Sequence, residues 1–321
     1  MKKIIYKGLI AAVTVLLVPF LLTTVLSRQS KTDLIDVFDF NIYYELNGIK
    51  KDLSFDDYLL GVVAANMPPG YQMDALKAQA VIARTYALYN IQLLSERNPG
   101  QKNFSTSELG LSYIGLDMLE QFWGSDNYNE YFTKFENAVY GTKGEILVYN
   151  DELILPVFFD TGSGFTRNAS EAWGIDIPYL VSVPSKQDVT SINYLKIKEF
   201  LIPDLITTLT SFYPDIRLTE DNFFDRVKVD SRDSAGYVLK VKLDEISISG
   251  EEFAKVIGLP SNHFYIENYE GDVRIICNGS GHGIGLSQYG ANAMAEEGST
   301  YKEILEYYYT GVNFINISED K

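Results

Sequence analysis

Four of the eleven residues from Gly281 to Ala291 are glycines, and this segment constrains the fold more than any other stretch of the chain. Glycines permit positive φ angles and let the backbone approach a neighbouring segment or a ligand closely. The same segment contains a histidine, a serine, a glutamine and a tyrosine, which a plain surface loop rarely combines. It therefore predicts a binding or catalytic loop that leads into a helix. From local chemistry alone, a glycine-rich turn between a strand and a helix is an equal alternative.

Two helices are expected after this loop. Ser287 can cap the first helix, which is predicted to end near Gly298. Thr300 and Glu303 have the spacing of a capping box, so a second helix is predicted from there to about Gly311.

The remaining pattern predicts an α+β domain of mixed helices and antiparallel strands. Helices are expected at 56–65, 75–95 and 251–257, and strands at 42–53, 145–148, 153–159, 228–229, 237–243 and 245–248. Residues 98–130 are rich in Gly, Asn and Ser, whereas residues 187–225 have a helical character. Both segments are predicted to be insertions.

The N-terminus has the form of a membrane anchor. Residues 1–7 carry three lysines and are expected in the cytoplasm, and residues 8–27 are uncharged and long enough to cross a bilayer as a helix. Residues 28–40 would form a tether to an extracytoplasmic domain at 41–315. A cleaved signal peptide is the alternative, but residues 23–27 make a poor cleavage site. The prediction is a single-pass protein of the cell membrane.

Three blocks of the sequence carry further motifs. The first reads YLLGVVAANMP and then ALKAQAVIARTYA, at residues 58–87. The second reads DTGSGFT, EAWG and PYLVSVP, at residues 160–184, and the third is GHGIGLSQYGANAMAEEGSTYKEILEYYYTGV, at residues 281–312. In this order they resemble the stage II sporulation protein D (SpoIID) and amidase-enhancer (LytB) family, over roughly residues 40 to 315.

The resemblance implies work on peptidoglycan outside the cytoplasm. Sporulation members of the family are lytic transglycosylases, which cleave glycan strands and leave an anhydro-muramyl end. They act in engulfment with the stage II proteins P and M, whereas amidase enhancers stimulate a cell-wall amidase. The expected partners are therefore glycan strands, an amidase of the protein P type and a membrane protein of the protein M type. A net charge of −16 argues against nucleic acid as a further partner.

Asn66 departs from the family pattern at the position that matters most. The family usually has Glu-Met-Pro there, with the glutamate as catalytic acid and base, but this chain has Asn66-Met67-Pro68. An amide has no proton to transfer near neutral pH. Asp160 is the best substitute carboxylate, since Asp74 is expected to cap a helix and Asp56 and Asp57 to be solvated. Two hypotheses follow: a transglycosylase that uses another carboxylate, and a catalytically silent glycan-binding scaffold or amidase enhancer.

The other cleft residues are assigned from the motif match. Lys77 and Arg84 are seven residues apart on one helix, so they share a face. His282 is expected to hydrogen-bond a sugar or to orient a neighbouring group. The complete set of expected substrate-binding residues is Lys77, Arg84, Thr161, Ser163, Thr166, Tyr179, His282, Ser287, Gln288 and Tyr289.

No metal or other cofactor is expected. Some members of the family hold zinc through a Cys and a His, but the comparable region at 105–109 has neither residue. The chain contains one cysteine, Cys277, and two histidines, His263 and His282. Zinc sites need three or four ligands in tetrahedral array. Cys277 is expected to be buried in a strand and His263 to lie at the surface.

Overall fold

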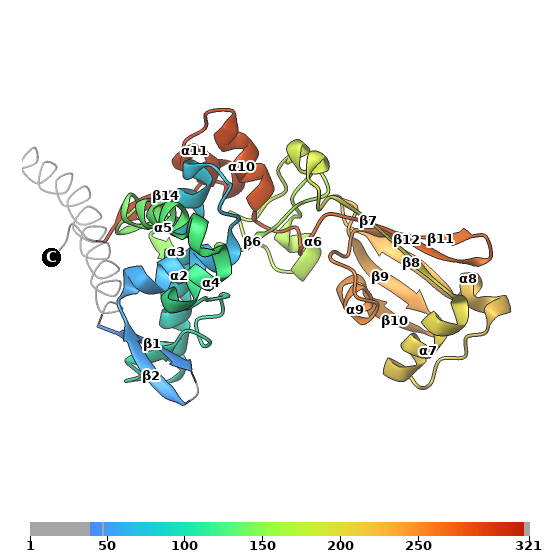
Figure 1. Ribbon diagram of the computed structural model, residues 1–321. Coiled ribbons are helices and arrows are strands. Elements are labelled where there is room, and N and C mark those ends of the chain that lie inside the picture. The colour runs from blue at the N-terminus through green and yellow to red at the C-terminus, as the bar shows by residue number, and fades with distance from the viewer. Residues whose placement is uncertain (1–38, 47, 318–321) are drawn as a thin grey trace, which may run out of the picture.

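The computed structural model describes residues 39–46 and 48–317, which form two lobes (Figure 1). One lobe combines helices and strands from both ends of the described chain, and the other is built from its middle. The anchor predicted at residues 8–27 lies outside the described residues, as do residues 1–7 and most of the tether. Within the described part of the chain, no helix is both long and apolar enough to cross a bilayer.

The first lobe is organised around a long helix, α3 (Met73–Arg97). Its sequence is rich in strong helix formers, with Asp74 in the first turn and Arg97 in the last, which suits the helix dipole. The lobe's other helices are α2 (Phe55–Asn66), α4 (Leu119–Trp123), α5 (Ser125–Tyr140), α10 (Gln288–Glu296) and α11 (Tyr301–Tyr308), with a 3-10 turn at Leu116–Met118. Its strands are β1 (Asn41–Leu46), β2 (Ile49–Leu53), β3 (Asn103–Ser105), β4 (Glu145–Tyr149), β5 (Glu152–Leu153) and β14 (Asn313–Asn316).

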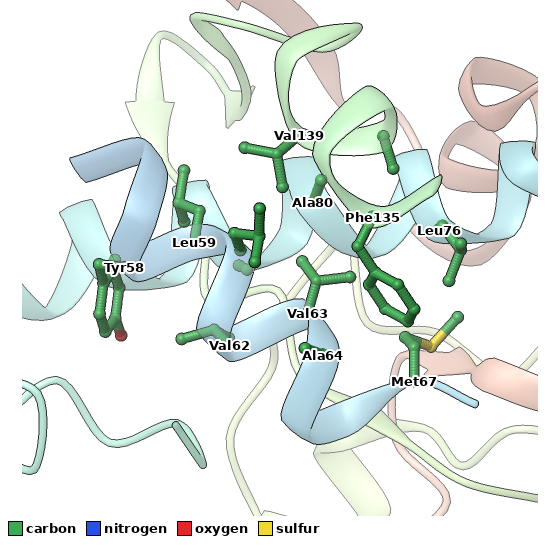
Figure 2. Close-up of a cluster of buried hydrophobic side chains, with 14 of the residues drawn as sticks. Tyr58, Leu59, Val62, Val63, Ala64, Met67, Leu76, Ala80, Phe135 and Val139 are labelled. Carbon is green, nitrogen blue, oxygen red and sulfur yellow. The ribbon is translucent and has the colours of Figure 1, made fainter. Parts of the chain in front are cut away.

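Helix α3 is buried between two apolar clusters. Leu76, Ala80 and Ala83 face the cluster formed with α2 and α5, which Figure 2 shows. Val81 and Ile82 face a second cluster, which includes residues of α10 and α11. The apolar residues at helical spacing along α3 are buried from Leu76 to Ile91, and Leu94 is half-buried. Since both sides of α3 are covered, the elements that α3 contacts are held in fixed positions.

The second lobe contains two three-stranded antiparallel sheets around their own apolar core. One sheet has the order β10-β9-β8 and the other β11-β12-β7. The strands are β7 (Leu195–Phe200), β8 (Val227–Arg232), β9 (Val238–Leu243), β10 (Ile246–Ser249), β11 (Phe264–Tyr269) and β12 (Asp272–Asn278). The helices are α7 (Ile202–Phe212), α8 (Phe223–Arg226) and α9 (Gly250–Val256), with a 3-10 turn at Glu220–Asn222.

Between the lobes lie two short parallel strands, β6 (Phe158–Phe159) and β13 (Leu286–Ser287). Helix α6 (Ala169–Trp173) and a 3-10 turn at Lys186–Thr190 lie in the same region of the chain. Figure 1 shows β6 and α6 at the junction of the two lobes. The segments that carry the second and third sequence motifs therefore meet here.

The structure refines the two segments that were predicted to be insertions. Residues 98–130 contain β3, which pairs with β1, and α4, whose Trp123 is buried in the first core. Residues 187–225 contain α7, as their helical character suggested, but also β7, which pairs with β12 along its whole length. This pairing makes the segment one edge of the second lobe, which continues to residue 278.

Two local predictions were wrong because of tertiary contacts. His263 is buried, with 7% of its surface exposed, and packs edge-to-face on Tyr237 at 5.2 Å between ring centroids. Asp74 does not cap α3, whose N-cap is Gln72; its Oδ1 accepts a hydrogen bond from the backbone nitrogen of Tyr301 at 3.1 Å. The prediction for Cys277 is confirmed, since the thiol is buried in β12.

Candidate functional site

The glycine-rich segment packs its backbone directly against β6. Leu286 and Ser287 pair in parallel with Phe158 and Phe159. Gly285 has a φ of +80°, and a Cβ atom at this position would lie 2.0 Å from the carbonyl oxygen of Val157. No other residue type fits that position without a shift of the backbone. The glycines therefore bring the third motif against the second.

Buried Asp188 connects the two motifs through hydrogen bonds. The Ser287 hydroxyl donates to its Oδ1 at 2.7 Å, and the backbone nitrogen of Gly162 donates to its Oδ2 at 2.8 Å. The Ser287 oxygen also accepts from the backbone nitrogen of Gly290 at 3.1 Å, which caps α10 as predicted. Burial raises the pKa of Asp188, whereas these hydrogen bonds oppose the rise. Because Asp188 and Ser287 are both fully buried, they position the loops and cannot touch a ligand directly.

Gln288 connects the third motif to the first. Its Nε2 donates to the backbone carbonyl of Asn66 at 2.9 Å and to Oε1 of Gln79 at 3.2 Å. Asn66 is the last residue of α2, so its carbonyl is one of those that a helix end leaves without an intrahelical partner. Gln288 satisfies this group and fixes the end of α2 beside α10.

The side chain of Asn66 is held by two backbone carbonyls. Its Nδ2 donates to the carbonyl oxygen of Val62 at 2.7 Å and to that of Ser112 at 2.9 Å. The residue is only half-buried, so part of it faces solvent. Both amide protons are engaged with the protein, and neither can be transferred to a sugar at neutral pH. The position therefore offers a polar contact without acid or base chemistry.

Asp160 lies in a polar group with Tyr71 and Tyr289. Its Oδ2 accepts from Nδ2 of Asn193 at 3.0 Å, its Oδ1 from the Thr161 hydroxyl at 3.2 Å, and its backbone oxygen from the nitrogen of Tyr289 at 3.0 Å. The pKa of Tyr71 is raised, first by burial and then by the charge of Asp160. Two hydroxyls and a carboxylate thus share one half-buried region.

Other residues that were expected to bind substrate serve mainly to hold the backbone. Thr161 and Thr166 are buried, and the Thr166 hydroxyl accepts from the nitrogen of Val183 at 2.8 Å. Ser163 is half-buried and donates to the carbonyl of Ala235 at 3.5 Å. The Tyr179 hydroxyl accepts from a backbone nitrogen in the β5–β6 connection at 2.9 Å.

The two basic residues of α3 lie in different environments. Arg84 is 1% exposed, and its guanidinium donates to the backbone carbonyls of Val139 and Glu145, each at 3.1 Å. Burial lowers its pKa to about 10, which still leaves it charged at neutral pH. Lys77 is half-buried, with its Nζ 5.7 Å from the centre of the Tyr301 ring. Of the two, only Lys77 has surface to offer a ligand.

His282 lies on the side of the loop that faces the second lobe. It lines a hollow of about 400 Å³ with α9 and residues 258–262, and neither Asn66 nor Asp160 lines that hollow. Its Nδ1 accepts from the nitrogen of Ile284 at 3.1 Å, and burial lowers the pKa of the ring. The expected role of His282, to hydrogen-bond a sugar or to orient a neighbouring group, stays a prediction.

Arg167 was missed by the sequence analysis, although it directly follows the second motif. It is 1% exposed, and its Nε donates to Oδ2 of Asp233 at 2.6 Å. Its Nη1 donates to Oε1 of Glu251 and to the carbonyl of His282, both at 3.0 Å. Arg167 therefore ties the glycine-rich loop to the second lobe. Its position beside the motif was a signal, whereas Tyr71 and Asp188 have no local signal beyond their residue type.

The side chains that could bind a metal ion are dispersed over the described residues. Within the described residues, no group of three or more His, Cys, Asp or Glu side chains is arranged to hold a metal ion. Burial raises the pKa of the Cys277 thiol to about 11. The thiol is therefore protonated at neutral pH.

Stage II sporulation proteins and an amidase enhancer are similar to this chain in sequence. A family model described as stage II sporulation protein matches residues 45–149. A stage II sporulation protein D from Bacillus amyloliquefaciens is 33% identical over 273 residues, which cover 85% of this chain and 77% of that protein. The protein of the same name from Bacillus subtilis (strain 168) is 31% identical over 271 residues, with 84% and 77% covered. An amidase enhancer from the same strain is 27% identical over 300 residues, which cover 79% of this chain and 39% of that protein.

Proposed function

The chain belongs to the stage II sporulation protein family, and we propose that it binds peptidoglycan glycan strands beside Asn66 without cleaving them through that residue. The strand would lie across the end of α2, next to the polar group of Asp160, Tyr71 and Tyr289. The observation that carries the proposal is the engagement of both Asn66 amide protons by backbone carbonyls. Transglycosylation needs a group that gives up a proton and takes one back, and this amide does neither.

The supporting hydrogen bonds favour a preserved binding surface. Gln288 still holds the carbonyl of Asn66, and Asp188 still joins the loops at Gly162 and Ser287. Asp188 is fully buried with both carboxylate oxygens hydrogen-bonded, which favours one arrangement of the backbone around it. Such an arrangement can bind sugar hydroxyls through side chains that need no proton transfer.

A transglycosylase that uses Asp160 is the second candidate. Asp160 is half-buried and lies near the phenol of Tyr71, so it is the carboxylate best placed in this polar group. Its two carboxylate oxygens already accept hydrogen bonds from Asn193 and Thr161. Both oxygens are therefore engaged with protein groups, which weighs against Asp160 as the group that acts on a sugar.

The stimulation of a wall amidase fits a glycan-binding protein that lacks its own acid. It is supported by the similarity to a protein named amidase enhancer. We further propose that residues 8–27 anchor the chain in the cell membrane with the domain outside, because that segment is apolar and follows three lysines. In this arrangement a protein P-type amidase and a protein M-type membrane protein are the partners to test.

The variant Asn66→Glu tests the missing acid directly. In Asn66→Glu, the carbonyls of Val62 and Ser112 would favour the protonated form of the new carboxyl group, which is the form that a general acid needs. The full chain in detergent is incubated with denuded glycan strands, and anhydro-muramyl ends are measured by mass spectrometry. We expect the wild type to bind strands without forming these ends and Asn66→Glu to form them, a gain of about 10²-fold or more.

Asn66→Gln is the matched control, since its side chain has the length of glutamate but no acid. It should bind strands and form no anhydro-muramyl ends. Products from the wild type that disappear in Asp160→Asn would show that Asp160 is the acid and would overturn the proposal. A wild type that fails to sediment with glycan strands would remove the binding function itself.

A further inference from the structure

An aromatic hollow of about 520 Å³ lies on the first lobe and plays no part in the geometry described so far. It is lined by residues of three segments of the chain, namely Tyr44, Tyr113, Ile114, Gly115, Met118, Gln121 and Phe122. Phe122 is 57% exposed and Met118 is 41% exposed, so large apolar side chains face solvent here. Exposed aromatic groups that gather around a hollow are typical of binding sites.

The ring of Tyr113 is held in place by α2. A Cβ atom on Gly61 would lie 2.3 Å from Cε2 of Tyr113, so the missing side chain at Gly61 lets the ring rest on the helix. The backbone nitrogen of Ile114 donates to the carbonyl of Gly61 at 3.3 Å. Tyr44 packs against Tyr113 at 5.5 Å between ring centroids. The platform is therefore fixed before any ligand arrives.

The lining of the hollow begins next to the segment that Asn66 contacts. Ser112, whose carbonyl accepts the Asn66 amide at 2.9 Å, directly precedes Tyr113 and Ile114. Consecutive Cα atoms are about 3.8 Å apart, so the aromatic platform begins one residue from the group that Asn66 contacts. The platform therefore follows directly on the segment that holds the Asn66 side chain.

The chemistry of the lining fits an uncharged ring. None of its seven residues is charged, and the nearby carboxylate of Asp117 is paired with Lys51 at 2.8 Å. Aromatic faces pack on apolar surfaces, and the amide of Gln121 offers both a donor and an acceptor for hydroxyl or acetamido groups. A pyranose ring presents apolar faces and hydroxyl edges of this kind.

We infer that this hollow is an extended saccharide subsite, which binds the sugar rings of a glycan strand beyond the unit held at Asn66. The inference rests on the proposed function, since it extends the same strand in one direction. Binding should therefore depend on the length of the glycan, and the part that depends on length should require Phe122.

The test measures calorimetric affinities of the full chain in detergent for two denuded glycan fragments, a disaccharide and an octasaccharide. The wild type should bind the octasaccharide more tightly than the disaccharide. Phe122→Ala should weaken the octasaccharide about three- to tenfold and leave the disaccharide unchanged, because one aromatic contact is lost. Phe122→Tyr keeps the ring and should keep the affinity. Since Phe122 is largely exposed, these changes should leave folding intact.

Phe212→Ala is the matched control, because Phe212 is 60% exposed on α7 of the other lobe. It should change neither affinity. If Phe122→Ala binds both fragments as the wild type does, the subsite is refuted and the proposed function stands. If the wild type binds neither fragment, the proposed function fails and the subsite fails with it.

Discussion

Several polar side chains of the three motifs form hydrogen bonds within the protein and are not exposed to a ligand. Ser287 and Thr166 were expected to touch substrate, yet both are fully buried and bond to neighbouring protein groups. Gln288, at 6% exposure, completes the end of α2. Such residues fix the geometry of a surface that half-buried neighbours present to solvent. The sharper candidates for ligand contact are Asn66, Tyr71 and Tyr289.

Asp188 should impose a pH dependence on stability. Burial raises its pKa in the folded chain, so the fold favours the protonated carboxyl group. Its contribution is fully present below the unfolded pKa of about 3.9 and is lost as the pH rises through the raised value. In Asp188→Asn this contribution cannot titrate. The free energy of unfolding of the wild type should therefore fall relative to that of the variant as the pH rises, by about 1.4 kcal/mol for each unit of pKa shift.

Urea unfolding of both proteins from about pH 4 to pH 7 measures this difference. Asp176→Asn, at an exposed loop position, controls for the loss of one carboxylate from an acidic chain. A difference that instead grows in favour of the wild type as the pH rises would mean that the hydrogen bonds from Ser287 and Gly162 outweigh burial.

At the scale of elements, helix caps and tight turns were predictable, because the residues that form them are close together in the sequence. The capping box of Thr300 and Glu303 is present, with the Glu303 carboxylate accepting from the Thr300 nitrogen at 2.8 Å. Strands were predicted at 145–148 and from 153, and Asn150 and Asp151 between them have the two positive φ angles, 51° and 65°, of a tight hairpin. Each of these features depends on residues within a few positions of one another.

Features that depend on distant partners were not predictable from one sequence. Asp188 meets Ser287 across 99 positions of sequence, and Arg167 meets Glu251 across 84. The burial of His263 depends on Tyr237, which lies 26 positions earlier and directly precedes β9. The resemblance placed the motifs of the candidate site in order, but it could not tell which of their side chains face inward. Arg84 is the clearest case, since its helical position was correct and its exposure was not.

Gly285→Ala should disrupt the pairing of β13 with β6. Its φ of +80° is strained for alanine, and the new Cβ would meet the Val157 carbonyl at 2.0 Å. The left-handed conformation alone costs about 1–2 kcal/mol, so the free energy of unfolding should fall by more than about 2 kcal/mol. Thermal and urea unfolding measure the loss, and faster amide hydrogen exchange should be concentrated at residues 157–160 and 284–288.

Gly174→Ala is the control that separates backbone strain from the steric clash expected in Gly285→Ala. Gly174 has a φ of +70° at the end of α6, and a Cβ there would meet nothing within 4 Å. Its cost should be limited to the strain of about 1–2 kcal/mol. Equal losses for the two variants would mean that the close approach of β13 to β6 does not contribute.

At the scale of the whole molecule, two separate cores must keep one orientation. The second lobe has its own apolar cluster. It is formed by residues 195–278, so the chain enters and leaves this lobe at the junction. Arg167 lies at this junction with only 1% of its surface exposed, and it bonds to Asp233, to Glu251 and to the carbonyl of His282. A single guanidinium thus contacts both sides of the junction.

Arg167→Met should loosen the two lobes from each other. The variant fills similar space but leaves Asp233, which is 1% exposed at its side chain, without its cation. Removing one member of a buried pair costs about 3–5 kcal/mol, and much of that cost can be avoided if the junction opens and water reaches the carboxylate. We therefore expect thermal unfolding to separate into two steps, with faster hydrogen exchange at 232–236 and 279–283. Arg274→Met removes an ion pair with Glu199 that is far more exposed, and its effect should be much smaller. If Arg167→Met lowers the melting temperature while unfolding stays in one step with exchange unchanged at the junction, Arg167 stabilises the fold without setting the orientation of the lobes.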